Sequence, residues 1–318
     1  MILTKCPLRV SLIGGSTDLT HFVDKFGKGS VISFTPNLYT YVSIHDNNVG
    51  KYIINYSLKE QASNPIDIKN KIVKNCVNYF SIPPCTITFN TNILSSGSGL
   101  ASSSSFIISM IKACVMYKKL DLSNKEINDL AFQIEKKINY LAGYQDVYGC
   151  GVGNFKRIDF RPTGQEVYKF LSFSFISKKY SMYLINTEIT RRSTNILETI
   201  DVSKSYHLLD MVDRMEKAIV EKKEGEVFEI FNYGWKIKKT TSKEIINNKT
   251  LLNLENYLFD SDLVKGLKLC GAGGGGYFLV FVEKQNEETF KQYFNKKYSN
   301  KPLINIEIEN NGITGVRI

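Results

Sequence analysis

The chain has 318 residues, of which 43% are hydrophobic and 23% charged. This composition can build one large or two ordinary globular domains and is untypical of a disordered chain. The net charge of +10 fits a polyanionic partner, but the basic residues form short, scattered runs without a zinc-finger, basic-zipper or RNA-binding signature, so no nucleic-acid partner is expected. No apolar segment approaches the ~20 residues that span a bilayer, so no membrane partner is expected either. Six isolated cysteines predict reduced core thiols of a cytosolic protein.

The hydrophobic pattern predicts strands and helices in irregular order. Extended segments are expected at 8–13, 30–34, 39–45, 52–56, 86–90, 182–186, 277–282, 304–308 and 315–318. Helical spacing occurs at 66–80, 106–116, 206–222 and 225–239, with a further helix before Asp260. Another helix starts at Ser123, whose capping box is completed by Glu126. Because the order lacks regular strand–helix–strand alternation, it favours the α+β class.

A Gly/Ser-rich stretch, 95–105, runs straight into the apolar helix predicted at 106–116. Backbone N–H groups at the start of a helix lack intrahelical partners, and the helix dipole adds positive charge there. Glycines at 97 and 99 allow close backbone approach and positive φ. The stretch therefore predicts an anion-binding loop. Its alternative is a flexible linker, which does not usually separate a strand from an apolar helix.

Two better-known nucleotide signatures do not fit this chain. The Gly/Ser loop is not Gly-x-x-x-x-Gly-Lys-Ser/Thr, and no His-Arg-Asp or Asp-Phe-Gly sequence of protein kinases is present. Gly271, Gly273 and Gly276 satisfy Gly-x-Gly-x-x-Gly, but they precede a predicted strand instead of joining a strand to a helix. The second glycine run therefore gives no evidence for a dinucleotide fold.

Three motifs in order, Pro7–Asp18, Ser96–Ser104 and Leu269–Gly276, resemble those of the GHMP kinases, and the similarity spans almost the whole chain. Within that family the sequence looks most like the bacterial D-glycero-D-manno-heptose 7-phosphate kinases. The features behind this choice are Gly-Ser-Thr-Asp ending at Asp18, Tyr-Gln-Asp-Val-Tyr at 144–148 and Ile-Thr-Arg at 189–191.

The resemblance implies a two-domain α+β fold. Residues 1–163 would form an ATP-binding and catalytic domain like ribosomal protein S5 domain 2, and residues 164–318 a ferredoxin-like domain that completes the cleft. A predicted turn at Thr163–Gln165 lies near this boundary. The implied activity is a cytoplasmic, ATP- and Mg²⁺-dependent transfer of a phosphate to the anomeric O1 of D-glycero-D-manno-heptose 7-phosphate. The product would be the 1,7-bisphosphate used for heptose-containing surface glycans. The protein would act as a monomer or as a homodimer.

The phosphate cradle implied by the resemblance is the run Ser96, Gly97, Ser98, Gly99, Leu100, Ala101, Ser102, Ser103 and Ser104. Two departures occur in it. Ala101 replaces the third glycine of the usual Gly-Leu-Gly-Ser-Ser, and serines precede the loop where proline is usual. We expect Ala101 to need a compatible φ or the loop to differ slightly, with no loss of charge or ligand.

Asp146 and Arg9 are the implied catalytic residues. Asp146 follows the break at Gly143 and would orient and deprotonate the attacking hydroxyl. A helix N-cap is the other interpretation of this aspartate, and the resemblance favours catalysis. Arg9, on a predicted core strand, would keep Asp146 ionised and counter developing charge, unless it simply faces outward.

Glu135 and Ser103 are the implied Mg²⁺ ligands, because hard oxygen ligands combined with ATP phosphates suit this ion. Glu135 precedes Asp146 by 11 positions (146 − 135), a spacing seen in relatives. It lies at the edge of the apolar stripe of its predicted helix, so a solvated helix face is a serious alternative.

The acceptor would be held by Asp18, assisted by Thr17 and Ser16, since a carboxylate accepts hydrogen bonds from sugar hydroxyls. Arg191 and Arg192 could clamp a phosphate already on the acceptor, or could be a surface pair. The second glycine run, including Gly273 and Gly274, would pack against the loop and the acceptor, or serve as a structural turn.

Other functions remain open from the sequence. The chain could be a GHMP kinase for another sugar or alcohol, of the galactose, fucose or mevalonate type. It could also be a catalytically silent sugar- or nucleotide-binding protein, although Asp146, Glu135, Ser103 and Arg9 are all present. A nucleic-acid-binding protein is a fourth hypothesis, suggested by the net charge.

Overall fold

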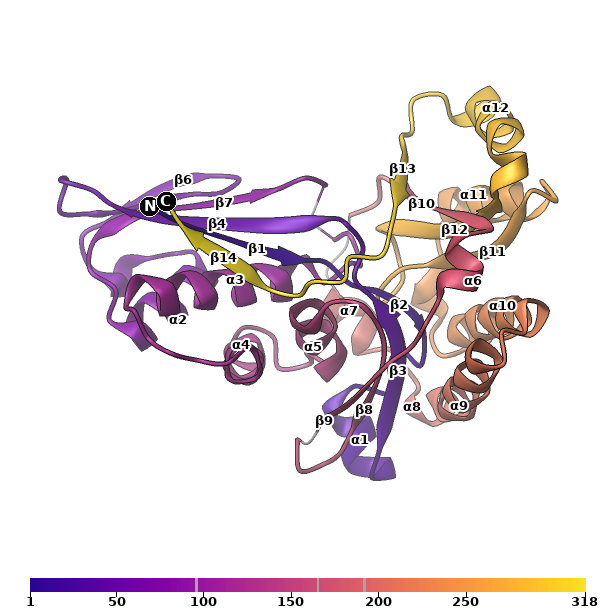
Figure 1. Ribbon diagram of the computed structural model, residues 1–318, viewed down its shortest axis with the longest axis horizontal. Coiled ribbons are helices and arrows are strands. Elements are labelled where there is room, and N and C mark those ends of the chain that lie inside the picture. The colour runs from indigo at the N-terminus through magenta and orange to yellow at the C-terminus, as the bar shows by residue number, and fades with distance from the viewer. Residues whose placement is uncertain (95–96, 165, 191–192) are drawn as a thin grey trace.

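The computed structural model describes residues 1–94, 97–164, 166–190 and 193–318 (Figure 1). Its strands are β1 (Ile2–Pro7), β2 (Val10–Ile13), β3 (Gly29–Phe34), β4 (Tyr39–Asp46), β5 (Tyr52–Asn55), β6 (Lys59–Ala62), β7 (Cys85–Thr91), β8 (Phe155–Phe160), β9 (Glu166–Phe170), β10 (Tyr180–Asn186), β11 (Val264–Leu269), β12 (Tyr277–Glu283), β13 (Leu303–Ile306) and β14 (Thr314–Arg317). Its helices are α1 (Thr20–Phe26), α2 (Lys71–Phe80), α3 (Ser102–Tyr117), α4 (Asn124–Ile138), α5 (Tyr144–Val152), α6 (Ser174–Ser177), α7 (Ser193–Leu197), α8 (Val202–Ser205), α9 (His207–Val220), α10 (Glu224–Thr240), α11 (Lys249–Phe259) and α12 (Glu287–Tyr298). Short 3-10 helices are η1 (Pro65–Asp67), η2 (Lys243–Ile246) and η3 (Lys284–Asn286). Mixed helices and strands in this order confirm the predicted α+β class.

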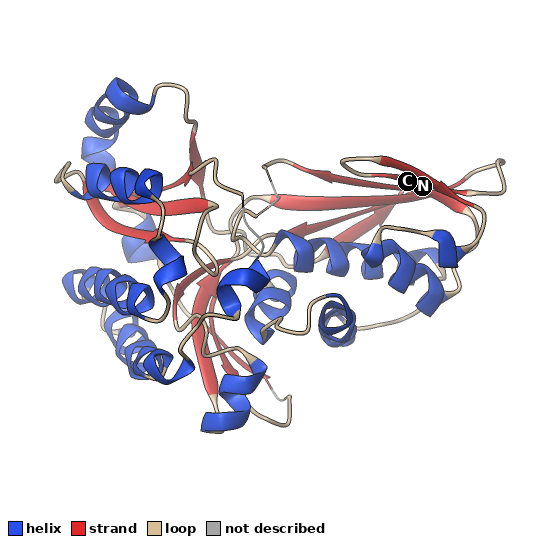
Figure 2. Ribbon diagram, turned by 180° about the vertical axis from the view of Figure 1, so that it is seen from behind, coloured by secondary structure: helices blue, strands red, loops and turns tan. Residues whose placement is uncertain are grey.

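A six-stranded sheet in the order β14-β1-β4-β7-β5-β6 forms one end of the described structure. Helices α2, α3 and α4 lie along one of its faces, as Figures 1 and 2 show. Strand β14, from the end of the chain, pairs antiparallel with β1, so the two termini lie side by side (Figure 1). Helix α3 packs against β1 and β4 and is mostly apolar after its four opening serines, so its first turn is fixed relative to this sheet.

A second sheet in the order β11-β12-β10-β13 forms the other end. Its strands β10 and β12 are buried on both faces, because alternate residues enter two different cores. Tyr183 and Val280 pack with α11 and α12, whereas Leu184 and Phe281 pack with α9 and α10. This sheet is therefore covered by helices on both sides (Figure 2).

A third sheet, β2-β3-β8-β9, lies between the two ends. Helices α9 and α10 from the second half of the chain contact β2 and β3 of the first half. Arg157 of β8 strengthens this junction through ion pairs with Asp213 and Glu216 of α9, at 2.7 and 2.6 Å. The end of β2 is thus held between the two halves.

Several predicted elements are confirmed with small shifts. Helix α4 starts after Ser123, and its capping box with Glu126 is present. The helix predicted from residue 66 begins only at Lys71, because Pro65 starts a short 3-10 helix and the Asn70 side chain caps α2. Strand β1 was not predicted. The predicted strand 8–13 is shortened to β2, which leaves Arg9 in the short break before it.

The division at residues 163 and 164 stays a prediction. Strands β8 and β9 pair with each other on either side of the predicted turn, and β14 pairs with β1 of the first part.

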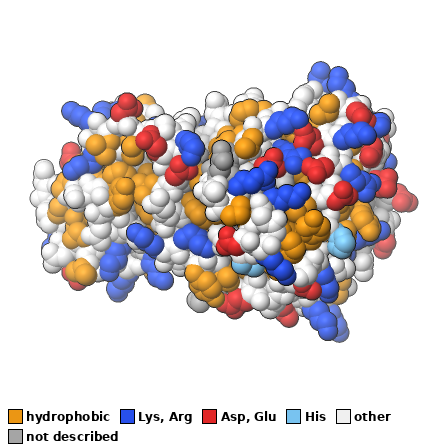
Figure 3. Space-filling view, turned by 90° about the horizontal axis from the view of Figure 1, so that it is seen from below, with side chains coloured by type: hydrophobic (Ala, Val, Ile, Leu, Met, Phe, Trp, Pro, Cys, Tyr) orange, Lys and Arg blue, Asp and Glu red, His pale blue; other side chains and the backbone are white. Residues whose placement is uncertain are grey.

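Within the described residues, no helix combines the length and apolar character needed to cross a membrane. On the face shown in Figure 3, Lys and Arg side chains alternate with Asp and Glu and do not gather in one arm.

Candidate active site

A pocket of about 530 Å³ lies between β2, the start of α3 and β11, and it collects residues from all three sequence motifs. Its walls include Arg9 and Asp18 from the first motif, the loop Gly97–Ser104 around the start of α3, and Gly271 from the second glycine run. Glu135 of α4 and Asp146 of α5 complete it. Residues that are far apart in the chain are therefore neighbours here.

The Gly/Ser loop winds tightly before α3. Gly97 and Gly99 have φ values of 65° and 75°, and Ala101, the residue before the helix, has φ 60° and ψ 37°. No side chain among the described residues caps α3, so its first N–H groups remain available to a ligand. The Ser98 hydroxyl bonds with Ser102 Oγ at 3.0 Å and accepts from the Leu100 N–H at 3.2 Å, which fixes the loop in this shape.

The two glycine-rich segments touch backbone to backbone. A Cβ atom on Gly99 would lie 2.4 Å from the Cys270 carbonyl oxygen, and one on Gly271 would lie 2.6 Å from Gly99 Cα. The Tyr277 N–H donates to the Ser98 carbonyl at 3.2 Å. The second glycine run therefore packs against the loop, and Gly271 and Ala272 reach the pocket.

Gly273 and Gly274, predicted to contact the acceptor, face another direction. Cβ atoms on these glycines would lie 2.8 Å and 2.9 Å from side-chain atoms of Ile245 and Ile196, respectively. Neither glycine is among the described residues that line the pocket. Glycine is therefore needed at both positions because a larger residue would collide with Ile245 or Ile196.

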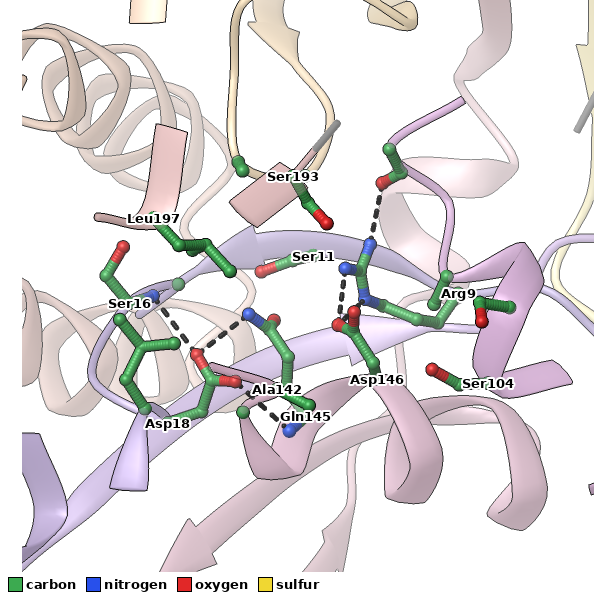
Figure 4. A pocket seen from close by; sticks show the side chains of 18 of the residues that line it. Arg9, Ser11, Ser16, Asp18, Ser104, Ala142, Gln145, Asp146, Ser193 and Leu197 are labelled. Carbon is green, nitrogen blue, oxygen red and sulfur yellow. Dashed lines mark hydrogen bonds and ion pairs between the residues drawn. The ribbon is translucent and has the colours of Figure 1, made fainter. Parts of the chain in front are cut away.

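Arg9 and Asp146 form an ion pair inside the pocket (Figure 4). The Arg9 Nη2 and Nε donate to Asp146 Oδ1 at 2.5 and 3.0 Å, and Nη1 donates to the Gly99 carbonyl at 2.8 Å. The Arg9 side chain is only 4% exposed and that of Asp146 is 33% exposed, so Arg9 does not face outward. Burial lowers the pKa of Arg9, but the facing Asp146 carboxylate raises it on balance.

Helix α5 explains where Asp146 points. Its N-cap is Gly143, so Asp146 is not a cap but stands in the first helical turn. The Asp18 carboxylate takes the capping role, because its Oδ2 accepts from the Gln145 N–H at 3.2 Å and its Oδ1 accepts from Gln145 Nε2 at 2.8 Å. A Cβ atom on Gly143 would lie 2.1 Å from Asp18 Oδ2, so only glycine fits there. Burial and the Asp146 charge raise the pKa of Asp18 to about 6.

Ser16 and Thr17 shape the turn that presents Asp18. Ser16 has φ 80°, its N–H donates to Asp18 Oδ1 at 3.1 Å, and it lines the pocket. Thr17 is fully buried, and its hydroxyl donates at 2.8 Å to the carbonyls of Gly14 and Ser30. Thr17 therefore holds the backbone, while Ser16 faces the cavity.

Glu135 is buried, with 5% exposure, which excludes the solvated helix face. The Ser104 hydroxyl donates to its Oε1 and Oε2 at 2.7 and 2.8 Å, whereas the predicted ligand Ser103 is exposed and lines the pocket. Burial and the Asp146 carboxylate raise the pKa of Glu135. Two neighbouring carboxylates in a buried site favour a cation between them. No group of three His, Cys, Asp or Glu side chains in the described parts of the chain could hold a metal alone, so an ion here would also need ligand oxygens and water.

A second cavity, of about 730 Å³, adjoins the loop and was not predicted. Phe89, Phe106 and Tyr56 line it together with Asn90 and Ser98. The three rings come from β7, α3 and the turn after β5, and no local motif marks them in the sequence.

Sequence reasoning also missed Gln145, Lys238 and Lys268, all of which line the first pocket. Gln145 lies within the quoted segment 144–148, beside Asp146, but the two lysines carry no motif of their own. Ser96, Arg191 and Arg192 lie outside the described residues.

Comparison with known proteins agrees with this geometry. Residues 68–154 match the family described as GHMP kinases N terminal domain. The chain is 29% identical over 308 residues to a D-glycero-alpha-D-manno-heptose 7-phosphate kinase of Campylobacter jejuni, covering 89% of each chain. It is 27% identical over 237 residues to a mevalonate kinase of Methanocaldococcus jannaschii, covering 71% of each. It shares the fold of a crystal structure of a D-glycero-D-manno-heptose 1-phosphate kinase from Bacteroides thetaiotaomicron, with a TM-score of 0.79, 21% identity, and coverage of 100% of this chain and 99% of that one.

The protein therefore has the fold of the GHMP kinases, and residues 68–154 match the N-terminal domain of that family. Like the kinases it resembles, it is a phosphotransferase.

The left-handed conformation of Ala101 gives a first prediction. Such a φ is strained for any residue with a Cβ and most strained for a β-branched one. Ala101→Gly should therefore keep the stability close to that of the wild type, because relief of strain offsets the greater freedom of the unfolded chain. Ala101→Val should lower the free energy of unfolding by about 1–3 kcal/mol. Urea unfolding of both variants measures this, and equal stability of the valine and glycine variants would contradict the observed loop geometry.

Proposed function

We propose that the protein transfers the γ-phosphate of ATP to the anomeric O1 of D-glycero-D-manno-heptose 7-phosphate. The observation that carries the proposal is the buried Arg9–Asp146 pair, set between the uncapped start of α3 and the carboxylate of Asp18. The similarity to the Campylobacter jejuni enzyme over most of both chains supports the choice of acceptor.

In this proposal Asp146 accepts the proton of the attacking hydroxyl. Its side chain is partly exposed to the pocket, and Arg9 donates only to its Oδ1. Its second carboxylate oxygen, Oδ2, can therefore face a ligand. The hydroxyl oxygen forms the new bond to phosphorus, the bond to the ADP oxygen breaks, and the proton passes to the carboxylate. Arg9 keeps Asp146 ionised beforehand and stabilises the charge that develops at the transfer site.

The nucleotide phosphates would bind at the loop Gly97–Ser104, where backbone N–H groups and the Ser102 and Ser103 hydroxyls are the donors. Leu100 is buried and contributes only its backbone, since its carbonyl accepts from the Arg9 N–H at 3.1 Å. We assign the base and ribose to the second cavity, because Phe89 and Phe106 offer flat apolar surface beside Asn90.

Glu135 and Ser103 would hold Mg²⁺ together with the phosphates. The raised pKa of the buried Glu135 fits a carboxylate whose charge a cation stabilises. When bound, Mg²⁺ supplies positive charge to the phosphate oxygens. Ser104, by donating to both Glu135 oxygens, orients that carboxylate toward the loop.

The acceptor would lie on Asp18, which is fixed by Gln145 and Ser16 and whose ionised form accepts hydrogen bonds from sugar hydroxyls. We also propose that the protein is cytoplasmic, since all six of its cysteines are free thiols and buried. The phosphate clamp of Arg191 and Arg192 stays a prediction.

Replacement of the proposed base tests the chemistry. Asp146→Asn should lower kcat by at least about 10²- to 10⁴-fold, because an amide cannot take the proton. Binding of ATP, measured by calorimetry, should change little. Asp121→Asn, at an exposed position between α3 and α4, is the matched control and should retain full activity. A kcat of Asp146→Asn near that of the wild type would contradict the assignment.

A panel of acceptors tests the substrate. We expect the highest kcat/KM for D-glycero-D-manno-heptose 7-phosphate, measured by ADP release and with the product position assigned by ³¹P NMR. Galactose, fucose and mevalonate should be far poorer, because they lack the anionic group or the heptose chain. Equal or better turnover of any of them would overturn the acceptor assignment while leaving the kinase assignment intact. An absence of turnover with every acceptor would favour a silent binding protein.

The pKa of Asp18 predicts a pH effect on acceptor use. The carboxylate is ionised above about pH 6 and protonated below it, so kcat/KM for the acceptor should fall as the pH drops through about 6. The acceptor phosphate also titrates near this pH, and Asp18→Asn separates the two. The variant should show a lower kcat/KM at neutral pH and a shallower acid limb. An identical pH profile for wild type and variant would exclude Asp18 as the group observed.

A further inference from the structure

Two lysines from the second half of the chain enter the first pocket. Lys238 lies on α10 and Lys268 on β11, and they are only 6% and 7% exposed. Lys238 Nζ donates to Ser16 Oγ. Lys268 Nζ donates to the carbonyls of Ser11 and Leu12 at 3.0 and 2.9 Å. The Lys268 ammonium therefore sits against β2, and that of Lys238 sits against the turn between β2 and Asp18.

These positions are costly for a positive charge. Lys268 takes part in none of the ion pairs of the described residues, and its observed acceptors are neutral carbonyls. Burial lowers the pKa of Lys268 to about 7, and the charges of Lys238 and Arg9 act in the same direction. The ammonium groups of Lys238 and Lys268 repel each other, and an anion bound between them would offset that repulsion.

The lysines lie toward the acceptor end of the pocket. In Figure 4 the Arg9–Asp146 pair separates Ser104 from Ser16 and Asp18, and Ser11 lies between Ser16 and the pair. Lys238 contacts Ser16 and Lys268 contacts Ser11, so their ammonium groups stand on the side away from Ser104 and the start of α3. A ligand group bound beside Ser16 and Lys238 would lie on the same side of the Arg9–Asp146 pair as Asp18.

We propose that Lys238 and Lys268, with the Ser16 hydroxyl, form an anion subsite that binds the phosphate monoester already present on the acceptor. A lysine ammonium has three N–H donors, so the two carbonyls bound by Lys268 leave one for a phosphate oxygen. The subsite selects phosphorylated over unphosphorylated acceptors. It deepens the proposed function and rests on it for the identity of the reacting hydroxyl.

Steady-state kinetics of lysine variants tests the subsite. Lys238→Met and Lys268→Met should raise KM for heptose 7-phosphate by about 10- to 100-fold, the value of a charged hydrogen bond. KM for ATP, and KM for the same heptose without its phosphate, should stay near the wild-type values. Lys238→Arg and Lys268→Arg should recover part of the loss. If Lys268→Met does not fold, Lys268→Arg still tests the subsite, because an arginine can donate to the Ser11 and Leu12 carbonyls.

Lys236→Met and Lys265→Met are the matched controls, because these lysines are exposed on the same helix and the same strand. They should leave both KM values unchanged. A rise in KM for ATP instead would assign the lysines to the nucleotide and overturn the subsite. Equal losses for both acceptors would show a purely structural role and also overturn it.

Failure of the proposed function gives a separate result. If the wild type phosphorylates neither heptose, inorganic phosphate serves as the probe in a thermal unfolding assay. A phosphate-dependent rise in Tm that Lys236→Met keeps and Lys238→Met loses would support an anion site without a heptose kinase. An equal rise in both variants, or none in the wild type, would overturn the subsite.

Discussion

The ion pair between Arg9 and Asp146 is the interaction on which the site depends. It joins the break before β2, the first turn of α5 and, through the Gly99 carbonyl, the loop before α3. A buried guanidinium is stable only if its donors are satisfied, so these three segments can adopt only arrangements that surround it. Because Asp146 stays partly exposed on its other side, the same pair that stabilises the junction leaves a carboxylate facing the cavity.

Close backbone contacts set the dimensions of the cavity. Gly99 and Gly271 approach so closely that a side chain on either would collide with the other segment, and Gly143 leaves space only for the Asp18 carboxylate. These contacts bring the start of α3, the start of α5 and the second glycine run to one place. The uncapped start of α3, the start of α5 and three carboxylates then share a small volume. The arrangement suits a reaction that needs a bound anion, a cation and an oriented hydroxyl at once.

The two halves of the chain contribute different charges to this volume. The first half supplies Asp18, Glu135 and Asp146 with one cation, Arg9, whereas the second half supplies Lys238 and Lys268. Lys238 donates to Ser16 and Lys268 to two carbonyls of β2, so these lysines also attach α10 and β11 to the first half. The two side chains that we propose to bind the acceptor phosphate are thus also contacts between the two halves.

The sequence by itself determined the elements with local signals. The capping box at Ser123, the apolar helix after the Gly/Ser loop and the helices α9 and α10 all follow from spacing within one segment. The loop and the second glycine run could be recognised because anion binding and close packing demand small residues in sequence. Only the tertiary structure decided which charged residues meet. Asp18, not Asp146, caps α5. Ser104 donates a hydrogen bond to Glu135, and Lys268 donates one to a carbonyl of β2. Burial and charge pairing depend on contacts between residues that are 31 to 256 positions apart in these examples, which no local pattern records.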